Sequence, residues 1–431
     1  MDISTRDSIK ILKTPSDSKD RYNNENENGN GSKDRNVNIN ENDNKGDNQY
    51  QDDIEKTTIT AKYIHGGYSK VTIYTATKLV VKRMPLYYEP GCLSFNAIVD
   101  ALFSRTVSYY DNTPELYKVS VTQKSLYLKM PYLGTSLYAL SKTLRKTHAL
   151  QIVGDIARVC IEMERIGLQH TDIKHSNIII SKSGEVYLID FNICSIKYVN
   201  HFSLWSPNLG TWDYASPEIC LLSTPTSTSA VWSLGILLCF LYGQHPLHDE
   251  IEDHDIDTSN NKQWSKLLTH ISKQNCIGLP LPAELTRAMP LELRKLFHRC
   301  TYWDPMQRIS LEDFYKYICS FKEYKVRPSV KLPPRFFTMK PVVGDSRNSD
   351  LDKMYGWCEE IKQLHLLCRS IGIYDRLSHY DYDDLNAPAC LCISYMLVGN
   401  YIYLDDPNIS TLAQKFHISD WSLFLRHIVN I

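Results

Sequence analysis

The first 55 residues contain few apolar positions, and residues 23–48 are almost entirely Asn, Asp, Glu, Lys, Gly and Ser. Such a segment cannot bury enough apolar surface to offset the conformational entropy that is lost on folding. We therefore expect residues 1–55 to form a disordered, Asn-rich tail rather than a domain.

From residue 57 onward, apolar and polar residues alternate as they do in half-buried strands. This pattern covers four segments, residues 57–60, 63–71, 79–82 and 125–130. A helical pattern lies among them at residues 94–108, and helical spacing dominates from residue 149 to about residue 321. Strands therefore gather at the start of residues 57–321, and helices follow them.

The pattern changes again after residue 321. Prolines at positions 328, 333, 334 and 341 predict a linker over residues 322–349. Helical patterns return over residues 350–431, and one of them is strongly apolar. These patterns predict a small all-α domain at the C-terminus, and a chain of 431 residues has room for both domains.

Composition narrows the class of protein. A net charge of -1 gives no nucleic-acid signature, and the polar start Met1-Asp2-Ile3-Ser4 does not fit a signal peptide. The 12 cysteines include no C-x-x-C pair and no metal-type spacing beyond Cys390-Leu-Cys392. The longest apolar run, residues 231–242, is shorter than the roughly 20 residues that span a bilayer. We expect an intracellular protein, in the cytoplasm or nucleus, with neither nucleic acid nor membrane as a partner.

Candidate chemistry lies in residues 170–177, between a helical segment and the apolar run 178–180. A turn signal at residues 182–184 and a second run, residues 185–189, lead to Asp190. If the two runs form a hairpin, Asn177 and Asp190 stand side by side at its open end. Their oxygens could hold a magnesium ion on phosphates, and Asp172 could accept a proton from an attacking hydroxyl. An accidental placement of these residues is the alternative, but their order and spacing favour phosphoryl transfer.

The segment His170-Thr171-Asp172, with Asn177 five residues after the Asp and Asp190-Phe191-Asn192 beyond it, resembles the catalytic loop and metal motif of eukaryotic-type protein kinases. Residues 209–218, which end in Ala215-Ser216-Pro217-Glu218, resemble the end of a kinase activation segment. The resemblance implies an α+β, bilobal protein-kinase fold over residues 57–321, with a small β-rich N-lobe and a helical C-lobe. It also implies a structural ion pair between Glu218 and Arg308.

The resemblance extends more weakly into the N-lobe. Of the three glycine positions in the family's phosphate loop, only one is a glycine here: they hold Ile64, Gly66 and Ser69, and Val71 matches the valine. Lys82 stands where the phosphate-pairing lysine is expected, and Asp100 is the acid that could pair with it. Taken alone, the glycine hairpin could be an ordinary β-turn. The implied nucleotide-binding set is Ile64, His65, Gly66, Gly67, Tyr68, Ser69, Val71, Lys82, Met130, Tyr132 and Leu133.

The resemblance also implies roles for single residues. Asp172 would deprotonate the substrate hydroxyl, Lys174 would neutralise charge on the transferring phosphate, and Thr211 would brace the loop. Asn177 and Asp190 would hold Mg2+. The expected function is that of a divergent serine/threonine kinase, with ATP and Mg2+ as cofactors and protein Ser/Thr hydroxyls as substrate. A pseudokinase scaffold that binds partners without phosphotransfer is the alternative.

Three departures from the family pattern stand out. Thr171 replaces the arginine that grips an activation-segment phosphate, so we expect no regulation by that phosphate. Ala230 replaces an aspartate that bonds to the catalytic-loop backbone, so the loop must be held in another way. Asn192 replaces a glycine, and Asn tolerates the left-handed conformation better than other non-glycine residues. Such divergence suits a viral lineage, with the host cell as the compartment.

Two further segments have more than one interpretation. Residues 245–255 combine three histidines with acidic residues, and an acidic loop is favoured over a metal site. In the C-terminal region, Trp357, the step Tyr374-Asp375-Arg376-Leu377 and residues 389–393 resemble the first helices of a cyclin box. Such a small helical bundle could dock on the kinase domain or on a partner, and a further hypothesis is that it activates the kinase domain of the same chain. A plain helical extension is the alternative.

Overall fold

The structure is a computed structural model, which describes parts of the chain between residues 61 and 424. These are residues 61–65, 69–89, 92–122, 124–198, 201–203, 212–222, 224–258, 260–327, 345–361, 386–397, 406–418 and 424. The predicted tail over residues 1–55 therefore lies outside the described residues, as do Gly66, Gly67, Tyr68 and Thr211.

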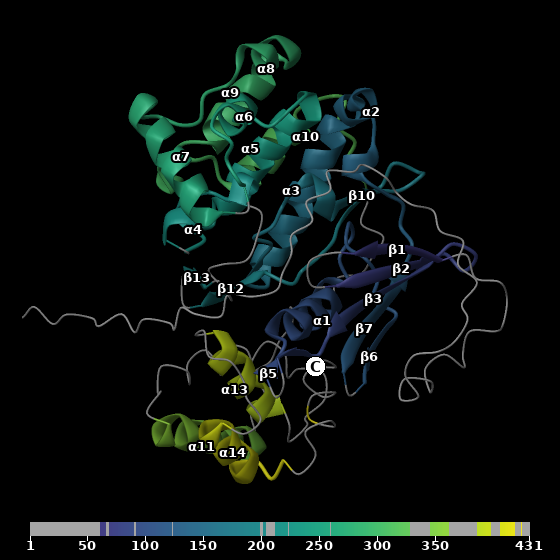
Figure 1. Cartoon of the computed structure of the whole chain (residues 1–431), viewed down its shortest axis with the longest axis vertical. Coiled ribbons are helices and arrows are strands. Elements are labelled where there is room, and N and C mark those ends of the chain that lie inside the picture. The colour runs from purple at the N-terminus through teal and green to yellow at the C-terminus, as the bar shows by residue number, and fades with distance from the viewer. Residues whose placement is uncertain are drawn as a thin grey trace, which may run out of the picture. The chain divides into compact units, whose positions relative to one another are not determined.

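The first part of the fold is a five-stranded antiparallel sheet in the order β1-β2-β3-β7-β6 (Figure 1). Its strands are Ala61–His65, Lys70–Tyr74, Leu79–Pro85, Ser125–Pro131 and Lys118–Val121, in that spatial order. Helix α1 (Phe95–Val107) packs against β7. Along β3, Lys82 and Met84 are buried whereas Arg83 and Pro85 are exposed. This period of two gives the sheet an inner and an outer face. A short hairpin, β4 (Tyr87–Glu89) and β5 (Cys92–Leu93), leads into α1.

The second part is helical and is built around α3 (Ala149–Arg165) and α5 (Ser229–Tyr242), which pack on each other. Helix α5 is buried along almost its whole length, as its run of apolar residues requires. It lies so close to α9 that a Cβ added at Gly235 would come within 2.8 Å of Cys300 Cβ. The remaining helices are α2 (Lys142–Thr147), α4 (Pro217–Leu222), α6 (His248–Asp253), α7 (Asn261–Gln274), α8 (Ala283–Ala288), α9 (Leu291–Cys300) and α10 (Leu311–Cys319).

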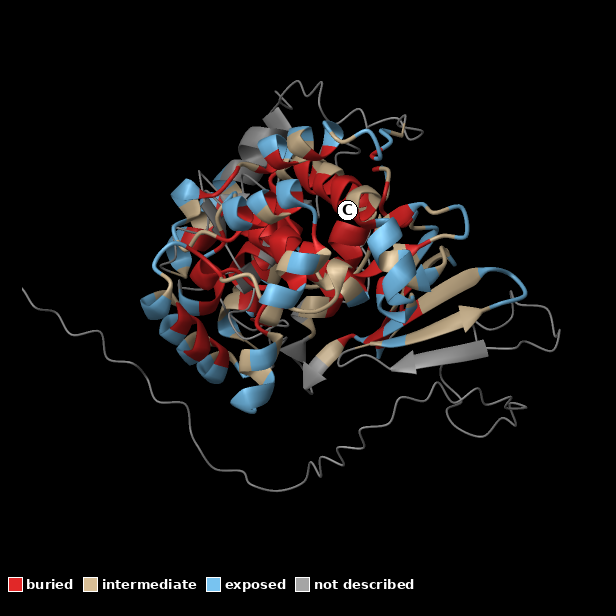
Figure 2. Cartoon of the chain, turned by 90° about the horizontal axis from the view of Figure 1, so that it is seen from above, coloured by how far each residue is buried: buried red, intermediate tan, exposed pale blue. Residues whose placement is uncertain are grey.

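Short strands carry the connecting segments of the helical part. Strands β10 (Ile178–Ile180) and β11 (Val186–Leu188) form the predicted hairpin, and β8 (Thr135–Ser136) pairs with β10. Strand β12 (Ser195–Tyr198) pairs with β9 (Leu168–Gln169) and β13 (His201–Ser203). Figure 2 shows buried positions gathered along the inner sides of the helices, with exposed positions on their outward sides. The β-rich part followed by a helical part confirms the predicted bilobal α+β fold.

The helical part continues past the predicted domain end at residue 321. Tyr324 is buried, and a Cβ added at Gly154 on α3 would lie 2.4 Å from its ring. Arg327 donates to the Gly184 carbonyl oxygen over 2.9 Å. The chain therefore stays on this part up to Arg327, because an aromatic ring fills the groove that a glycine leaves on α3.

The C-terminal region holds α11 (Asp345–Glu360), α13 (Asn386–Leu397) and α14 (Pro407–Lys415). Helix α11 packs against both of the others. Trp357 is fully buried and donates its indole N–H to the Asn408 carbonyl oxygen over 3.0 Å. Helix α11 begins inside the segment that the prolines mark as a linker. In the described residues, no helix is both long and apolar enough to cross a bilayer.

Candidate active site

Lys82 lies in the middle of β3, not at its end as the sequence indicates, because the strand continues to Pro85. Its cross-strand partners place a row of residues on the inner face. Ile64 pairs with Val71, Val71 pairs with Lys82, and Lys82 pairs with Leu128. Lys82 is thus the one charged residue of this row, and 9% of its surface is exposed.

Two carboxylates meet the Lys82 ammonium group. Its Nζ lies 2.7 Å from Asp100 Oδ2 on α1 and 2.8 Å from Asp190 Oδ1 after β11. Burial disfavours the lysine cation, but the two carboxylates outweigh it, so the pKa of Lys82 is raised. Burial raises the pKa of Asp100, whereas for Asp190 the pull of Lys82 outweighs burial and its pKa falls. Asp190 is therefore held in its ionised form.

Asp100 also contacts the segment that follows Asp190. Its Oδ1 accepts the backbone N–H of Phe191 over 3.1 Å and the Ser104 hydroxyl over 3.3 Å. The shorter acid thus reaches the lysine and one further backbone donor at once. Helix α1, strand β3 and the segment after β11 are consequently tied together at a single side chain.

The β10–β11 hairpin brings Asn177 and Asp190 to the same end. Ile178 pairs with Leu188, and the amide of Ile189 donates to the Asn177 carbonyl oxygen over 3.0 Å. Asp190 has a φ of 72°, in the left-handed region that Asp tolerates better than most residues. The expected placement of the two residues side by side is what the structure shows.

Asp172, Lys174 and Asn177 form a second cluster in the loop before β10. Asp172 Oδ2 lies 2.8 Å from Lys174 Nζ. The same oxygen accepts a hydrogen bond from Asn177 Nδ2 over 2.8 Å. Asn177 Nδ2 also donates to the Asp172 carbonyl oxygen over 2.9 Å. Both side-chain contacts of Asp172 use Oδ2, and both bonds of Asn177 use its amide nitrogen. Oxygen Oδ1 of each residue is thus the atom left to meet a ligand.

His170 is a positioning residue for which the sequence predicts no role. Its Nδ1 accepts the amide of Asp172 over 3.2 Å, so Nε2 carries the proton and donates to the Ile189 carbonyl oxygen over 3.2 Å. Burial lowers its pKa, which keeps the ring neutral in this tautomer. Its ring meets Phe191 edge-on, with centroids 5.4 Å apart. One histidine therefore links the catalytic loop to the segment that carries Asp190.

Thr171 and Ala230 depart from the family pattern, and two hydrogen bonds near them hold the loop. The Thr171 hydroxyl donates to the Ile193 carbonyl oxygen, which fastens the loop to the segment after Asp190. Gln169 Nε2 donates to the Thr226 carbonyl oxygen over 2.7 Å, just before α5. Ala230 itself is buried and has no polar side-chain atom. Gln169 thus makes the connection between the catalytic loop and the start of α5 from the loop side.

Glu218 and Arg308 form the expected ion pair. Arg308 Nη1 and Nη2 lie 2.7 and 2.8 Å from Glu218 Oε1 and Oε2. Ser229 donates to Glu218 over 2.6 Å, and the Arg308 guanidinium stands 5.0 Å from the Trp232 ring centroid. Burial raises the pKa of Glu218, but Arg308 outweighs it, so that pKa is lowered. The pair joins the end of the activation segment to the turn before α10.

Three further ionisable residues, Asp213, His245 and His175, lie near the loop, and the sequence predicts no role for them in the site. Burial raises the pKa of Asp213 to about 6, although Lys174 opposes the shift. His245 Nδ1 accepts the Leu247 amide over 3.0 Å, so its Nε2 donates to the Asp213 carbonyl oxygen over 2.9 Å. His175 contacts the Tyr214 hydroxyl over 2.8 Å and stacks on Phe240. Burial lowers the pKa of both histidines to about 4. No motif marks these positions, since their environment arises only on folding.

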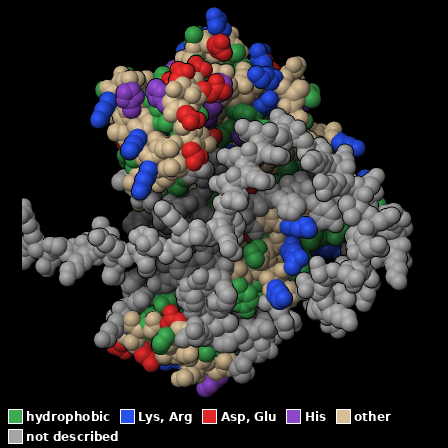
Figure 3. Space-filling view, in the orientation of Figure 1, with side chains coloured by type: hydrophobic (Ala, Val, Ile, Leu, Met, Phe, Trp, Pro, Cys, Tyr) green, Lys and Arg blue, Asp and Glu red, His purple; other side chains and the backbone are tan. Residues whose placement is uncertain are grey.

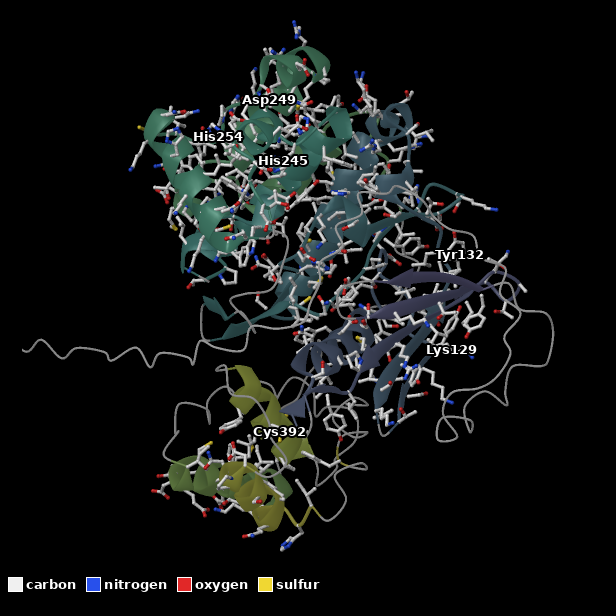
Figure 4. All side chains as sticks on the ribbon, viewed as in Figure 1. Lys129, Tyr132, His245, Asp249, His254 and Cys392 are labelled. Carbon is white, nitrogen blue, oxygen red and sulfur yellow. The ribbon has the colours of Figure 1, made fainter. Side chains whose placement is uncertain are left out.

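The expected adenine-binding residues lie at the end of β7. Met130 is half-buried, and Tyr132, labelled in Figure 4, is 38% exposed. The amide of Tyr132 donates to the Lys78 carbonyl oxygen over 2.8 Å and is therefore already used. Among the N-terminal residues, Ile64 and His65 lie on β1, Ser69 precedes β2 and Val71 lies on it.

The histidine-rich segment after α5 is a short helix rather than a loop over His248–Asp253. Figure 4 labels His245, Asp249 and His254 in the helical part. Across the described residues, no three His, Cys, Asp or Glu side chains are grouped so that they could hold a metal ion. The predicted acidic loop is therefore helical over these six residues.

Comparisons with known proteins agree with this geometry. Residues 66–318 match the family model described as the protein kinase domain. A serine/threonine-protein kinase 1 of Heliothis zea nuclear polyhedrosis virus is 30% identical over 36% of this chain and 58% of its own length. Sperm motility kinase 2A of Mus musculus is 29% identical over 41% of this chain and 36% of its own length. An Aurora kinase of Dictyostelium discoideum is 30% identical over 39% of this chain and 37% of its own length. The chain thus spans less than two thirds of each relative. Because the family model covers more than half of the 431 residues, this chain belongs to the protein kinase family.

Proposed function

We propose that this protein is a serine/threonine kinase that transfers the γ-phosphate of Mg-ATP to protein hydroxyl groups. The observation that carries the proposal is the meeting of two clusters at the open end of the β10–β11 hairpin. One cluster is Asp172, Lys174 and Asn177, and the other is Lys82 with Asp190. A proton acceptor, two cations and two oxygen ligands are what phosphoryl transfer requires.

The side chains present fit a magnesium ion. The amide nitrogen of Asn177 is fixed by its two bonds to Asp172, so its carbonyl oxygen faces away from that residue. Asp190 gives one oxygen to Lys82 and keeps the other, and its lowered pKa keeps the carboxylate charged. Carboxylate and amide oxygens are the ligands that Mg2+ prefers. When bound, the ion would neutralise charge on the phosphate oxygens.

The segment after β7 supplies the donor for an adenine edge. Pro131 has no N–H, and the amide of Tyr132 is bonded to Lys78. Among these three residues, the amide of Leu133 is then the donor, and the Pro131 carbonyl is the neighbouring acceptor. Met130 and Val71 would cover the apolar faces of the base. We assign Lys82 to the nucleotide phosphates because it projects from the same inner face.

Asp172 is the proton acceptor in this proposal. Lys174 and Asn177 hold its Oδ2, so Oδ1 can receive the proton of a Ser or Thr hydroxyl. The hydroxyl oxygen then forms a bond to the γ-phosphorus as the bond to the β-phosphate oxygen breaks. Lys174 lies beside Asp172 and would stabilise the charge on the phosphate in transfer.

The decisive experiment compares wild type with Asp172→Asn. We expect Mg-ATP to raise the melting temperature of both proteins, and phosphate transfer to a generic Ser/Thr protein to fall roughly 10²- to 10⁴-fold in the variant. Asp253→Asn makes the same chemical change on the exposed end of α6 and should leave transfer unchanged. Nucleotide binding without any transfer by the wild type would instead favour the pseudokinase scaffold.

The C-terminal helices are assigned a regulatory role in the same chain. Their own packing around Trp357 supports a separate folded unit that could dock on the kinase domain. Removal of residues 345–431, which takes away α11 from its first residue, should lower kcat for the generic substrate. Unchanged turnover in the shortened chain would exclude this role, and whether the unit is a cyclin box stays a prediction.

A further inference from the structure

The sheet β1-β2-β3-β7-β6 presents two chemically different faces. Its inner face carries the row of Val71, Lys82 and Leu128 described above. On the outer face, strand registers align Lys70 with Arg83, Arg83 with Tyr127, and Tyr127 with Ser120. The next row aligns Thr72 with Val81, Val81 with Lys129, and Lys129 with Lys118. We name Lys70, Arg83, Lys118 and Lys129 the basic face.

The strands that carry the basic face are rich in basic and poor in acidic residues on that side. None of the outer-face positions that these registers define on β2, β3, β7 and β6 is Asp or Glu. Lys118 and Lys129 are direct cross-strand partners, and like charges placed opposite each other destabilise a sheet. Figure 3 shows Lys and Arg side chains gathered over β3, β7 and β6, and Figure 4 labels Lys129 there. The positive charge is thus concentrated in spite of its local cost.

Arg83 is held along this face. Its Nε donates to the Ser125 hydroxyl over 3.0 Å, and its guanidinium carbon lies 5.7 Å from the Tyr127 ring centroid. Lys70, Arg83 and Lys118 are exposed, and Lys124 adds an exposed cation in the turn between β6 and β7. An orderly, accessible row of cations is suited to an extended polyanion that lies across the strands.

The sequence carries net negative charge shortly before β1. Residues 1–40 contain seven acidic and seven basic residues and are therefore neutral. Residues 41–55 contain six acidic residues and one lysine, which gives a net charge of -5. They precede β1, the edge strand of the same sheet. The net negative charge of residues 1–55 thus comes from the part that is nearest to β1 in the sequence.

Residues 41–60 are long enough to reach from β1 across the sheet to β6. Four strand spacings separate β1 from β6, about 19 Å in total. Residues 56–60 can span up to roughly 17 Å when extended, and the acidic segment itself can span more than twice that distance. A tethered segment also acts at an effective concentration on the order of millimolar, which favours it over an anion free in solution.

We propose that residues 41–55 bind across the basic face as an acidic strap within the same chain. The strap matches the face in charge, is connected to its edge strand and requires no second molecule. Its binding is independent of phosphotransfer, since the face lies on the side of the sheet opposite Lys82. Because exposed charges are screened beyond about 8 Å at physiological ionic strength, the contact weakens with added salt.

Lysine acetylation tests the proposal on the full chain. One variant converts the six acids of the strap to amides, namely Glu41→Gln, Asp43→Asn, Asp47→Asn, Asp52→Asn, Asp53→Asn and Glu55→Gln. We expect Lys118 and Lys129 to be acetylated about threefold faster in this variant than in wild type at low salt, and equally fast in both proteins at about 0.5 M salt. Lys262 and Lys266, exposed on α7, are the internal control and should not change.

A second variant separates the strap from the rest of the tail. It converts the seven acids of residues 1–40 to amides and should leave the acetylation of Lys118 and Lys129 at the wild-type rate. Equal rates at Lys118 and Lys129 in wild type and the strap variant at low salt would overturn the proposal. So would a tail variant that behaves like the strap variant.

A carbodiimide cross-linker then identifies the occupant, because it joins carboxylates to lysines in direct contact. We expect cross-links from residues 41–55 to Lys118 or Lys129 within one chain. In a mixture of isotope-labelled and unlabelled protein, mixed-label cross-links would show that a second copy occupies the face, which contradicts a strap in cis. Tight binding of a labelled single-stranded oligonucleotide, lost in Lys118→Gln/Lys129→Gln, would replace the strap by nucleic acid.

Discussion

Asp100 Oδ1 accepts the backbone N–H of Phe191 over 3.1 Å, which couples helix α1 directly to the segment that carries Asp190. The same carboxylate pairs with Lys82 through Oδ2. A glutamate would extend further from α1, so the shorter side chain requires the helix to lie near this segment. The position of α1 is therefore part of the site and not only of the N-lobe core.

Asp100→Ala should destabilise the protein by about 3 kcal/mol, because it leaves a buried lysine with one carboxylate where there were two and removes the acceptor for the Phe191 amide. Mg-ATP affinity should fall as well. Urea denaturation and nucleotide titration measure the two effects. Asp111→Ala, which removes a longer 3.5 Å pair with Arg158, is the control and should cost about 1 kcal/mol or less. Equal losses in both variants would contradict a special role for Asp100.

Arg308→Met should cost about 3 to 5 kcal/mol, because it leaves the Glu218 carboxylate buried without its partner. Glu218→Gln combined with Arg308→Met should recover part of that loss, as a double-mutant cycle in urea can show. The lowered pKa of Glu218 sets the pH dependence: the stabilisation is present above its unfolded pKa and is lost as the pH falls through the folded value. Lys316→Met breaks an exposed pair with Asp313 and should change little. Additive losses in the cycle would argue against coupling.

Gln169→Met should lower kcat more than it changes KM, since it removes the donor that links the catalytic loop to Thr226 and leaves a carbonyl without its partner. The stability cost should be about 1 to 3 kcal/mol. Hydrogen exchange of residues 168–172 should speed up, a readout that does not require activity. Gln151→Met makes the same change on α3, where Gln151 bonds to Asp155. If it perturbs the loop equally, Gln169 has no positioning role.

His245→Gln should make the protein less sensitive to mild acid. The folded pKa of His245 is lowered to about 4, so the unfolded chain takes up a proton first as the pH falls below about 6.5. The stabilisation from the neutral ring is complete above that pH and declines by about 1 to 2 kcal/mol at pH 5. Melting temperatures at pH 7 and pH 5 measure the effect. His270→Gln, at an exposed position on α7, should retain the wild-type pH dependence. A variant of His245 that is equally acid-sensitive would rule out this histidine as the cause.

Local patterns were enough to predict where two side chains of the candidate site lie. The hairpin at residues 178–189 follows from two apolar runs around a glycine turn, and it places Asn177 beside Asp190 in the structure. Period-two alternation and helical spacing predict the β-rich and helical parts. Glu218 and Arg308 are distant in sequence, and only the family resemblance connects them before folding.

Tertiary structure decided what no local pattern encodes. The neutral tautomer of His170, the raised pKa of Asp213 and the use of Asp100 for two partners all depend on burial and on segments far apart in the chain. The continuation of the helical part past residue 321 depends on Tyr324 filling the groove at Gly154. Sequence fixes which groups can ionise, donate or bury apolar surface, whereas the fold sets their distances and their access to water, on which pKa and pairing depend.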